Sequence, residues 1–151
     1  METLRKHRRG APPGFFRVEA AGLAWLADAG AVRVARVLAV DDDSIELERL
    51  PHAPATLQAA EAFGRDLAAL HDAGAHGGHR ITDLAMLALF RAPQLGRVLA
   101  AYAEASEHLP DRWRDLVPLH QVHPLLVHAV LFGGGYVAQA ERAASEALSL
   151  P

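Results

Sequence analysis

Residues 77–90 read Gly77-Gly78-His79-Arg80-Ile81-Thr82-Asp83-Leu84-Ala85-Met86-Leu87-Ala88-Leu89-Phe90. The two glycines interrupt what precedes them, and Thr82 or Asp83 can cap a helix with a side-chain oxygen. The run from Leu84 to Phe90 is apolar on every side, which is typical of a helix surrounded by others. We therefore predict a central buried helix with Asp83 at its N-terminus, where free backbone N–H groups and the helix dipole favour a carboxylate.

The composition is that of a globular chain. Its 151 residues are 51% hydrophobic and 22% charged, enough for one domain with a core. Cysteine is absent, which excludes disulfides and zinc sites built on thiolates. No apolar run approaches bilayer length, and the first residues lack the apolar core of a signal peptide. We expect a cytoplasmic protein with no membrane partner.

The positive charge is concentrated in arginine, because Lys6 is the only lysine among fifteen basic residues. Residues 5–9 read Arg-Lys-His-Arg-Arg, which allows a nucleic-acid-binding arm. However, the net charge is −3 and no aromatic residue interrupts the basic run. A solvated or locally paired cluster fits better, so we do not expect a nucleic-acid partner.

The chain before Leu50 favours strands and one helix. We predict a short strand at Leu4–Lys6, a helix at Phe15–Asp28, and a hairpin of Val32–Val40 and Ser44–Leu50. The turn of this hairpin is Asp41-Asp42-Asp43, which lacks the ligand spacing of a calcium loop.

Glu19 falls on the predicted apolar face of the first helix, together with Phe15, Leu23 and Leu26. A carboxylate buried without a partner is costly. We therefore expect a cation beside Glu19, with Lys6 as first choice and Arg36 as second. The alternative is a glutamate at the edge of the face that reaches solvent.

After Leu50 the pattern is helical. Pro124 suits a first helical turn, and Gly133-Gly134-Gly135 permits a sharp reversal. We divide the chain into residues 1–53, with strands and one helix, and residues 54–151, which are helical, and expect one compact unit. The predicted helices are Thr56–Asp72, the central helix, Pro93–Glu107, Asp111–Leu119, Pro124–Phe132 and Tyr136–Leu148.

Most catalytic motifs are absent: the phosphate-binding loop ending in Gly-Lys-Ser/Thr, Gly-x-Ser-x-Gly, and His-Glu-x-x-His. Nine histidines include two groups, one of His120, His123 and His128 and one of His71, His76 and His79. No carboxylate or cysteine completes either group at a typical metal-ligand spacing. We therefore predict no metal site.

Three stretches resemble the fructosamine (ketosamine) kinase family, a branch of the aminoglycoside-phosphotransferase-like kinases. Gly14-Phe15-Phe16 through Glu19-Ala20-Ala21-Gly22-Leu23 resembles the helix that bears the partner of the phosphate-binding lysine. His79-Arg80-Ile81-Thr82-Asp83-Leu84-Ala85-Met86 resembles the segment after the magnesium-binding aspartate. His123-Pro124-Leu125-Leu126-Val127-His128-Ala129 and Phe132-Gly133-Gly134-Gly135-Tyr136 resemble the C-terminal signature.

The resemblance implies an α+β fold, in which a remnant of a protein-kinase-like N-lobe packs on a mostly helical C-terminal bundle. It implies ATP and Mg²⁺ as cofactors and a sugar adduct on an amine or protein as substrate. In that family pattern Lys6 would hold nucleotide phosphates, and Glu19 would orient it. The backbone at Glu48 to Leu50 would meet adenine, and Asp83 would brace the catalytic loop.

The sequence departs from that pattern inside the catalytic region. It has no His-Gly-Asp loop, no Asp-Pro metal motif and no asparagine. It passes from Leu70-His71 directly into the segment that follows the metal motif, and the family's glycine-rich strands before Lys6 are also missing. We therefore assign no catalytic residue and no metal ligand, and expect no activity, because phosphoryl transfer depends on positioning and metal-assisted charge neutralisation.

Two interpretations remain. The chain is an inactive member of the kinase family, such as an internal-deletion product or a misassembled gene, or it is a binding or scaffold protein that reuses the helical half. Loss of the catalytic interior should leave the helix at Leu84–Phe90 incompletely covered. Because exposed apolar patches mark interfaces, we expect a homo-oligomer, with the helical half at the contact.

Overall fold

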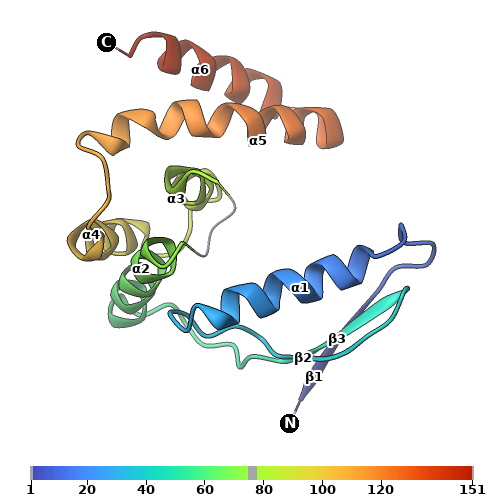
Figure 1. Cartoon of the computed structure of the whole chain (residues 1–151). Helices are drawn as coiled ribbons and strands as arrows, with labels where there is room; N and C mark the ends of the chain where they lie inside the picture. The colour runs from blue at the N-terminus through green and yellow to red at the C-terminus, as the bar shows by residue number, and fades with distance from the viewer. Residues whose placement is uncertain (1, 75–77, 151) are drawn as a thin grey trace.

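The computed structural model describes residues 2–74 and 78–150 and has an α+β fold. A three-stranded antiparallel sheet and α1 form one part, and the remaining helices form the other (Figure 1). None of the helices in the described ranges combines the length and apolarity needed to cross a membrane. The elements are β1 (Thr3–His7), α1 (Phe15–Asp28), β2 (Val37–Val40), β3 (Ser44–Glu48), α2 (Leu57–Asp72), α3 (Arg80–Leu89), α4 (Leu95–Ala105), the 3₁₀ helix η1 (Trp113–Leu116), α5 (Val117–Phe132) and α6 (Tyr136–Leu148).

The sheet has the order β1-β3-β2, so β3 is central and the other two strands are edges. Ile45 and Leu47 of β3 are buried against Phe16 of α1, which covers one face of the sheet. The predicted strand Val32–Val40 is wrong in its first half, because strand pairing begins only at Val37. A β-branched run favours a strand, but only residues that reach β3 can complete a ladder.

The buried face of α1 differs from the predicted one by one residue. Phe16 is buried, and Ala20 and Leu23 pack beside it, whereas Phe15 is 40% exposed. Phe15 and Phe16 are adjacent, so each can begin an apolar stripe along the helix, and the two stripes lie side by side. Contact with Ile45 in the sheet selects the stripe that begins at Phe16.

The main helical core lies where α2, α3 and α4 meet. Its buried members are Leu67, Ala68, Leu70, Ile81, Leu84, Tyr102 and Trp113. The α2 helix starts as predicted, because the Thr56 side chain accepts a hydrogen bond from the Ala59 N–H at 3.1 Å. Leu26, Ala29 and Val32 also pack against this core. The boundary between residues 53 and 54 stays a prediction.

The α3 helix lies between the α2–α4 pair and the α5–α6 pair (Figure 1). Its cap is neither Thr82 nor Asp83. The His79 side chain accepts the hydrogen bond from the Ile81 N–H, and Asp83 lies in the first turn with its side chain 56% exposed. Phe90 follows the helix and is 53% exposed. The prediction of a helix buried on every side is therefore wrong.

Residues 117–132 form one helix, not two as predicted. Pro124 lies inside it and cannot donate to the carbonyl of His120, a loss that typically costs ~3 kcal/mol. Packing on α6 stabilises the continuous helix, because Leu125 of α5 is buried together with Ala140 and Ala143 of α6. The helix ends before Gly133, whose φ of 64° favours glycine.

Candidate functional site

Lys6 and Glu19 form the ion pair that the sequence predicted. Lys6 lies on the edge strand β1 opposite Ile45, and Glu19 lies on α1 above the sheet. Lys6 Nζ is 2.5 Å from Glu19 Oε1, and the side chains are 50% and 28% exposed. An ammonium group has three donors, so Lys6 can bind Glu19 and still donate to a phosphate oxygen.

Glu19→Ala should change the free energy of unfolding by no more than ~1 kcal/mol, because the pair is only partly shielded from water. Urea denaturation followed by circular dichroism measures this. Glu61→Ala is the matched control, since Glu61 forms a similarly exposed pair with Arg97 at 3.3 Å. A loss of ~3 kcal/mol for Glu19→Ala alone would indicate a buried pair and contradict this expectation.

Glu48 is held by two arginines at the end of β3. Its carboxylate accepts hydrogen bonds from Arg33 at 2.9 Å and Arg36 at 3.2 Å, and its side chain is 14% exposed. The hydrogen bond from Arg36 lowers the pKa of Glu48, partial burial opposes this, and Arg33 lowers it further. Arg36, the second choice for Glu19, therefore pairs with Glu48.

The backbone beside Glu48 is partly used within the protein. The Glu48 N–H donates to the Arg36 carbonyl at 2.8 Å, and the Arg49 N–H donates to the Glu2 carbonyl at 3.0 Å. Leu50 lies beyond the end of β3. The side chain of Leu50 is 38% exposed.

Asp83 contacts a buried histidine. Its carboxylate lies 3.1 Å from Nε2 of His71, whose Nδ1 lies 2.8 Å from the Tyr102 hydroxyl. A carboxylate only accepts hydrogen bonds, so Nε2 of His71 donates to Asp83. In a neutral ring, Nδ1 then accepts from the Tyr102 hydroxyl. Burial raises the pKa of Tyr102, and Arg80 offsets part of that effect. Asp83 thus connects α3 to the end of α2.

Arg80 extends this cluster to Asp72. Its guanidinium donates to Asp72 at 2.6 Å and to the Ser106 hydroxyl at 3.0 Å. Burial acts to raise the pKa of Asp72, but hydrogen bonds from Arg80 and the Glu107 N–H bring it below its ordinary value. Sequence reasoning missed this cluster. His71 falls at i+7 from Gly64 on the buried face of α2, which could have indicated a buried polar group.

The predicted site residues fall into three separate sets. Across residues 2–74 and 78–150, no hydrogen bond or ion pair connects Lys6 and Glu19 with Glu48 or with Asp83. The first pair joins β1 to α1, Glu48 lies at the end of β3, and Asp83 lies on α3 (Figure 1). The structure brings together only the lysine and its glutamate.

Among the described residues, four histidines of the two sequence groups form side-chain hydrogen bonds, namely His71, His79, His120 and His128. His120 Nδ1 lies 2.9 Å from the Thr82 hydroxyl, and His128 Nδ1 donates to the Pro124 carbonyl at 2.8 Å. Burial and then nearby His79 lower the pKa of His120. His76 lies outside the described residues. Within the part of the chain that is described, no cluster of three or more His, Cys, Asp or Glu side chains could hold a metal ion.

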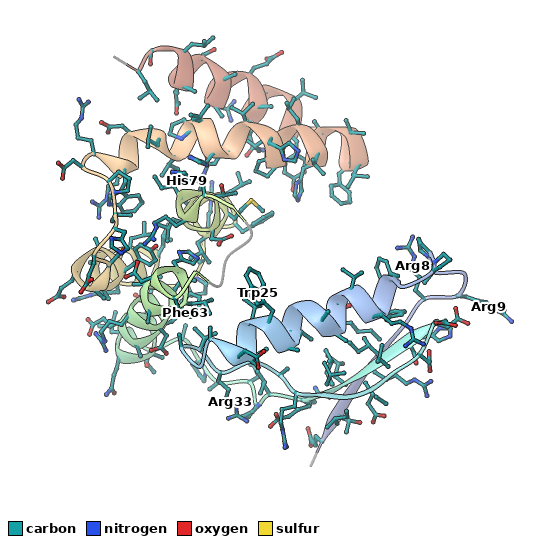
Figure 2. The ribbon with its side chains drawn as sticks, viewed as in Figure 1. Arg8, Arg9, Trp25, Arg33, Phe63 and His79 are labelled. Carbon is teal, nitrogen blue, oxygen red and sulfur yellow. The ribbon has the colours of Figure 1, made fainter. Side chains whose placement is uncertain are left out.

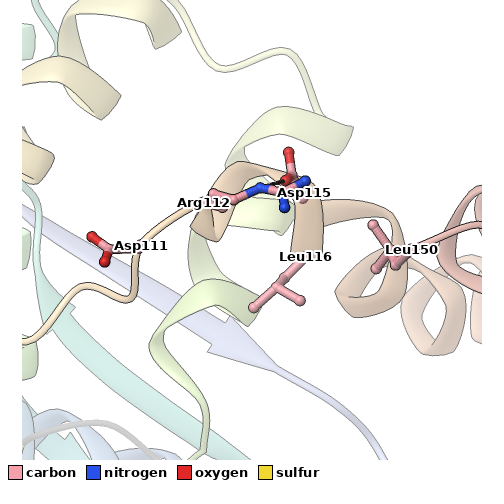
Figure 3. A pocket seen from close by; sticks show the side chains of 5 residues that line it. All are labelled: Asp111, Arg112, Asp115, Leu116 and Leu150. Atoms are coloured by element: carbon pink, nitrogen blue, oxygen red, sulfur yellow. Dashed lines mark hydrogen bonds and ion pairs between the residues drawn. The ribbon is translucent and has the colours of Figure 1, made fainter.

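A small pocket near the start of α5 has a volume of about 170 Å³ (Figure 3). Arg112 and Asp115 on its wall pair with each other at 2.7 Å, and Leu116 and Leu150 line the rest. Asp111 also lines the pocket, so its wall carries one more acidic than basic side chain. None of the predicted site residues lines this pocket.

No protein-family model matches the chain. A Klebsiella aerogenes protein named "Probable ketoamine kinase" is 34% identical over 87 residues, which are 58% of this chain and 30% of that protein. A crystal structure from Thermobifida fusca YX-ER1, described as a "putative fructosamine-3-kinase", matches with a TM-score of 0.87 and 28% identity. This match covers 98% of this chain and 86% of that chain. Together, the two matches support assignment of this chain to the fructosamine kinase family.

This assignment confirms the resemblance carried by the three sequence stretches, and the α+β architecture is the fold of this fructosamine kinase match. The chain spans less than a third of the length of the curated relative it matches. The family assignment therefore rests on fold and sequence together. It does not carry the activity of the whole ketoamine kinase over to this chain.

Proposed function

We propose that this fructosamine kinase family protein binds nucleotide phosphates at Lys6 and Glu19 but does not transfer a phosphoryl group. The observation that carries the proposal is the ion pair between Lys6 Nζ and Glu19 Oε1. A strand lysine oriented by a glutamate of the next helix is the device that kinases use to hold phosphates. ATP is the proposed nucleotide, and we keep the cytoplasm as the proposed location.

The residues of this chain fit the nucleotide better than they fit magnesium. Lys6 is half exposed and keeps donors for a phosphate oxygen, and the Leu50 backbone lies outside the strand pairing. Mg²⁺ requires oxygen ligands from carboxylates, amides or phosphates. The sequence has no asparagine, and the described residues contain no suitable cluster of metal-ligating side chains. The present residues therefore do not fit a magnesium site.

The catalytic base is also missing from the sequence. A family kinase would need a carboxylate beside the sugar hydroxyl, and no His-Gly-Asp occurs in these 151 residues. Asp83, which lies in the segment that resembles the family's post-metal segment, contacts His71. With neither base nor metal ligands, the remaining lysine can neutralise charge but cannot activate the hydroxyl. We propose that the sugar adducts phosphorylated by kinases of this family are not turned over here.

The proposal predicts binding without turnover. The purified chain is titrated with a fluorescent ATP analogue, and ADP release is measured with ATP, Mg²⁺ and a fructosyl-lysine peptide. Lys6→Ala should weaken nucleotide binding about tenfold, the effect of losing roughly 1.4 kcal/mol of interaction. Arg9→Ala is the control, because Arg9 is an exposed cation at the turn after β1 (Figure 2). Neither variant should alter the background rate of ADP release.

Two results would contradict the proposal. Equal nucleotide binding by the wild type, Lys6→Ala and Arg9→Ala proteins would remove Lys6 from the site. ADP release that depends on both Mg²⁺ and peptide, and that is lost in Lys6→Ala, would show an active kinase.

The second candidate function is a non-catalytic binding or scaffold role for the helical half. A specific observation favours it, because Leu126, Val130 and Leu131 of α5 are each more than half exposed. A helix that presents leucine and valine to solvent in a chain of this size is typical of an interface. Such a role requires neither nucleotide nor metal.

A further inference from the structure

The outer side of α5 is apolar and uncovered. None of the sixteen residues of α5 is Asp, Glu, Lys or Arg. One side of the helix packs on α6 through Leu125, and another faces α3, where the Gln121 amide donates to the Ala85 carbonyl at 2.9 Å. The remaining side is open to solvent. We call it the α5 surface, and with Val137 of α6 it consists of Leu119, Leu126, Val127, Val130, Leu131 and Val137.

The α5 surface forms a continuous stripe. Leu119, Leu126 and Val130 are spaced by seven and four residues, which places them on one line along the helix. Their exposed fractions are 52%, 52% and 87%. Figure 1 shows α5 and α6 side by side, at the end of the molecule opposite the sheet. This position leaves the stripe accessible along its length.

The size of the stripe fits an interface. With about 150–200 Å² for a whole residue, its exposed parts amount to roughly 500–700 Å², as much as the largest apolar patch of a typical monomer. Two such surfaces in contact would bury roughly 1,000–1,400 Å², near the lower limit for a specific protein–protein interface. A weak but specific dimer, with dissociation in the micromolar range, is the expected consequence.

The α5 surface has two grooves along it. A groove of about 500 Å³ runs between α5 and α6, with Val122, Ala129 and Ala140 on its walls. A second groove of about 310 Å³ lies along the other side of the stripe, beside Val127 and Leu131. Leu126 and Val130 line both grooves and therefore form a ridge between them. The ridge of one copy can enter the groove of another, as helices pack ridges into grooves.

The chemistry of the surface selects an apolar partner. Among the residues that line the two grooves, only His123 and Glu141 are ionisable. A charged peptide or a nucleic acid would lose hydration here without gaining an ionic partner. A second copy of the same surface offers apolar contacts and a matching ridge.

We propose that two copies of this chain associate through the α5 surface about a two-fold axis. The interface buries the stripe of each copy in the groove between α5 and α6 of the other. This association does not depend on nucleotide binding at Lys6. The sequence-based expectation was that the central helix would be left uncovered. Instead, α5 contacts α6 on one side and α3 on another, and its remaining side, with Leu126 and Val130, is exposed.

Sedimentation velocity on the full chain over a dilution series from about 1 to 100 μM tests the proposal, since association at micromolar affinity depends on concentration. The wild type should shift from monomer to dimer with rising concentration. Val130→Glu should remain a monomer of 16.2 kDa throughout. Val18→Glu is the matched control, because Val18 of α1 is 73% exposed and lies outside the α5 surface, and it should dimerise like the wild type.

Circular dichroism of both variants verifies that the helices are retained. A wild type that stays at 16.2 kDa over the whole series overturns the proposal. Equal behaviour of the two variants places the contact elsewhere and also overturns it. Growth of species beyond the dimer would show an open, head-to-tail contact instead of a closed two-fold one.

Discussion

Replacing Gly64 with alanine is expected to lower the free energy of unfolding by about 1–3 kcal/mol, although alanine is the better helix former. A Cβ atom at Gly64 would lie 2.3 Å from the Val98 carbonyl oxygen, and 3.1 Å from both the Ala101 Cβ and the Tyr102 nitrogen. The first and last are backbone atoms of α4, so no side-chain rotation can relieve the overlap. The α2 and α4 helices would have to move apart.

Gly22→Ala is the matched control for this prediction. Gly22 lies within α1, and a Cβ atom at its position would meet no atom within 4 Å. There the better helix propensity of alanine should raise stability by up to ~1 kcal/mol. Urea denaturation of both variants, at one protein concentration, measures the two effects. If both substitutions change stability in the same direction, the close approach of α2 and α4 at Gly64 is not formed in solution.

Leu84→Ala should destabilise the protein by about 2–5 kcal/mol. Leu84 of α3 is fully buried, and its core includes Ile81, Tyr102 and Trp113. Removal of the isobutyl group leaves a cavity between helices whose positions are also held by the hydrogen bonds of His71. Because those helices can close only part of the space, the loss exceeds the transfer free energy of the missing atoms.

A leucine-to-alanine substitution at an exposed helix position distinguishes the effect of burial on stability from the effect of helix propensity. Leu148 of α6 is 87% exposed, so Leu148→Ala should change the free energy of unfolding by less than ~0.5 kcal/mol. Thermal and urea unfolding give both values. Similar values for the two leucines would mean that α3 is not enclosed by α2, α4 and η1 in solution.

Sequence reasoning recovered the features that depend on short segments. It placed α1 at its observed bounds, and it predicted the end of α2 at Asp72 and of α6 at Leu148. Capping by Thr56, glycine at helix ends and the spacing of apolar residues act within a few positions. The pairing of Lys6 with Glu19 also followed from sequence, because a carboxylate in this helix needed a cation.

The family motifs were likewise present in the sequence, since each is a contiguous run of residues. The contacts that these motif residues make in this chain depend on residues far away in the sequence. Asp83 was expected to brace a catalytic loop, and in the structure it contacts His71 at the end of α2. Twelve positions separate the two residues, and their contact exists only because α2 and α3 pack together.

The sequence by itself determined the helices with strong local signals, the strand pattern around the Asp41–Asp43 turn, and the absence of a His-Gly-Asp loop. Only the tertiary structure decided which stripe of α1 is buried, where β2 begins, and whether Pro124 breaks a helix. For the buried stripe of α1 and the start of β2, the local alternatives are nearly equal, whereas Pro124 disfavours a continuous helix by ~3 kcal/mol. The difference is made by contacts with Ile45 in the sheet or with Ala140 in α6, which lie far away in the chain. Packing energy from such contacts exceeds local preferences of ~1–3 kcal/mol and so selects the observed form.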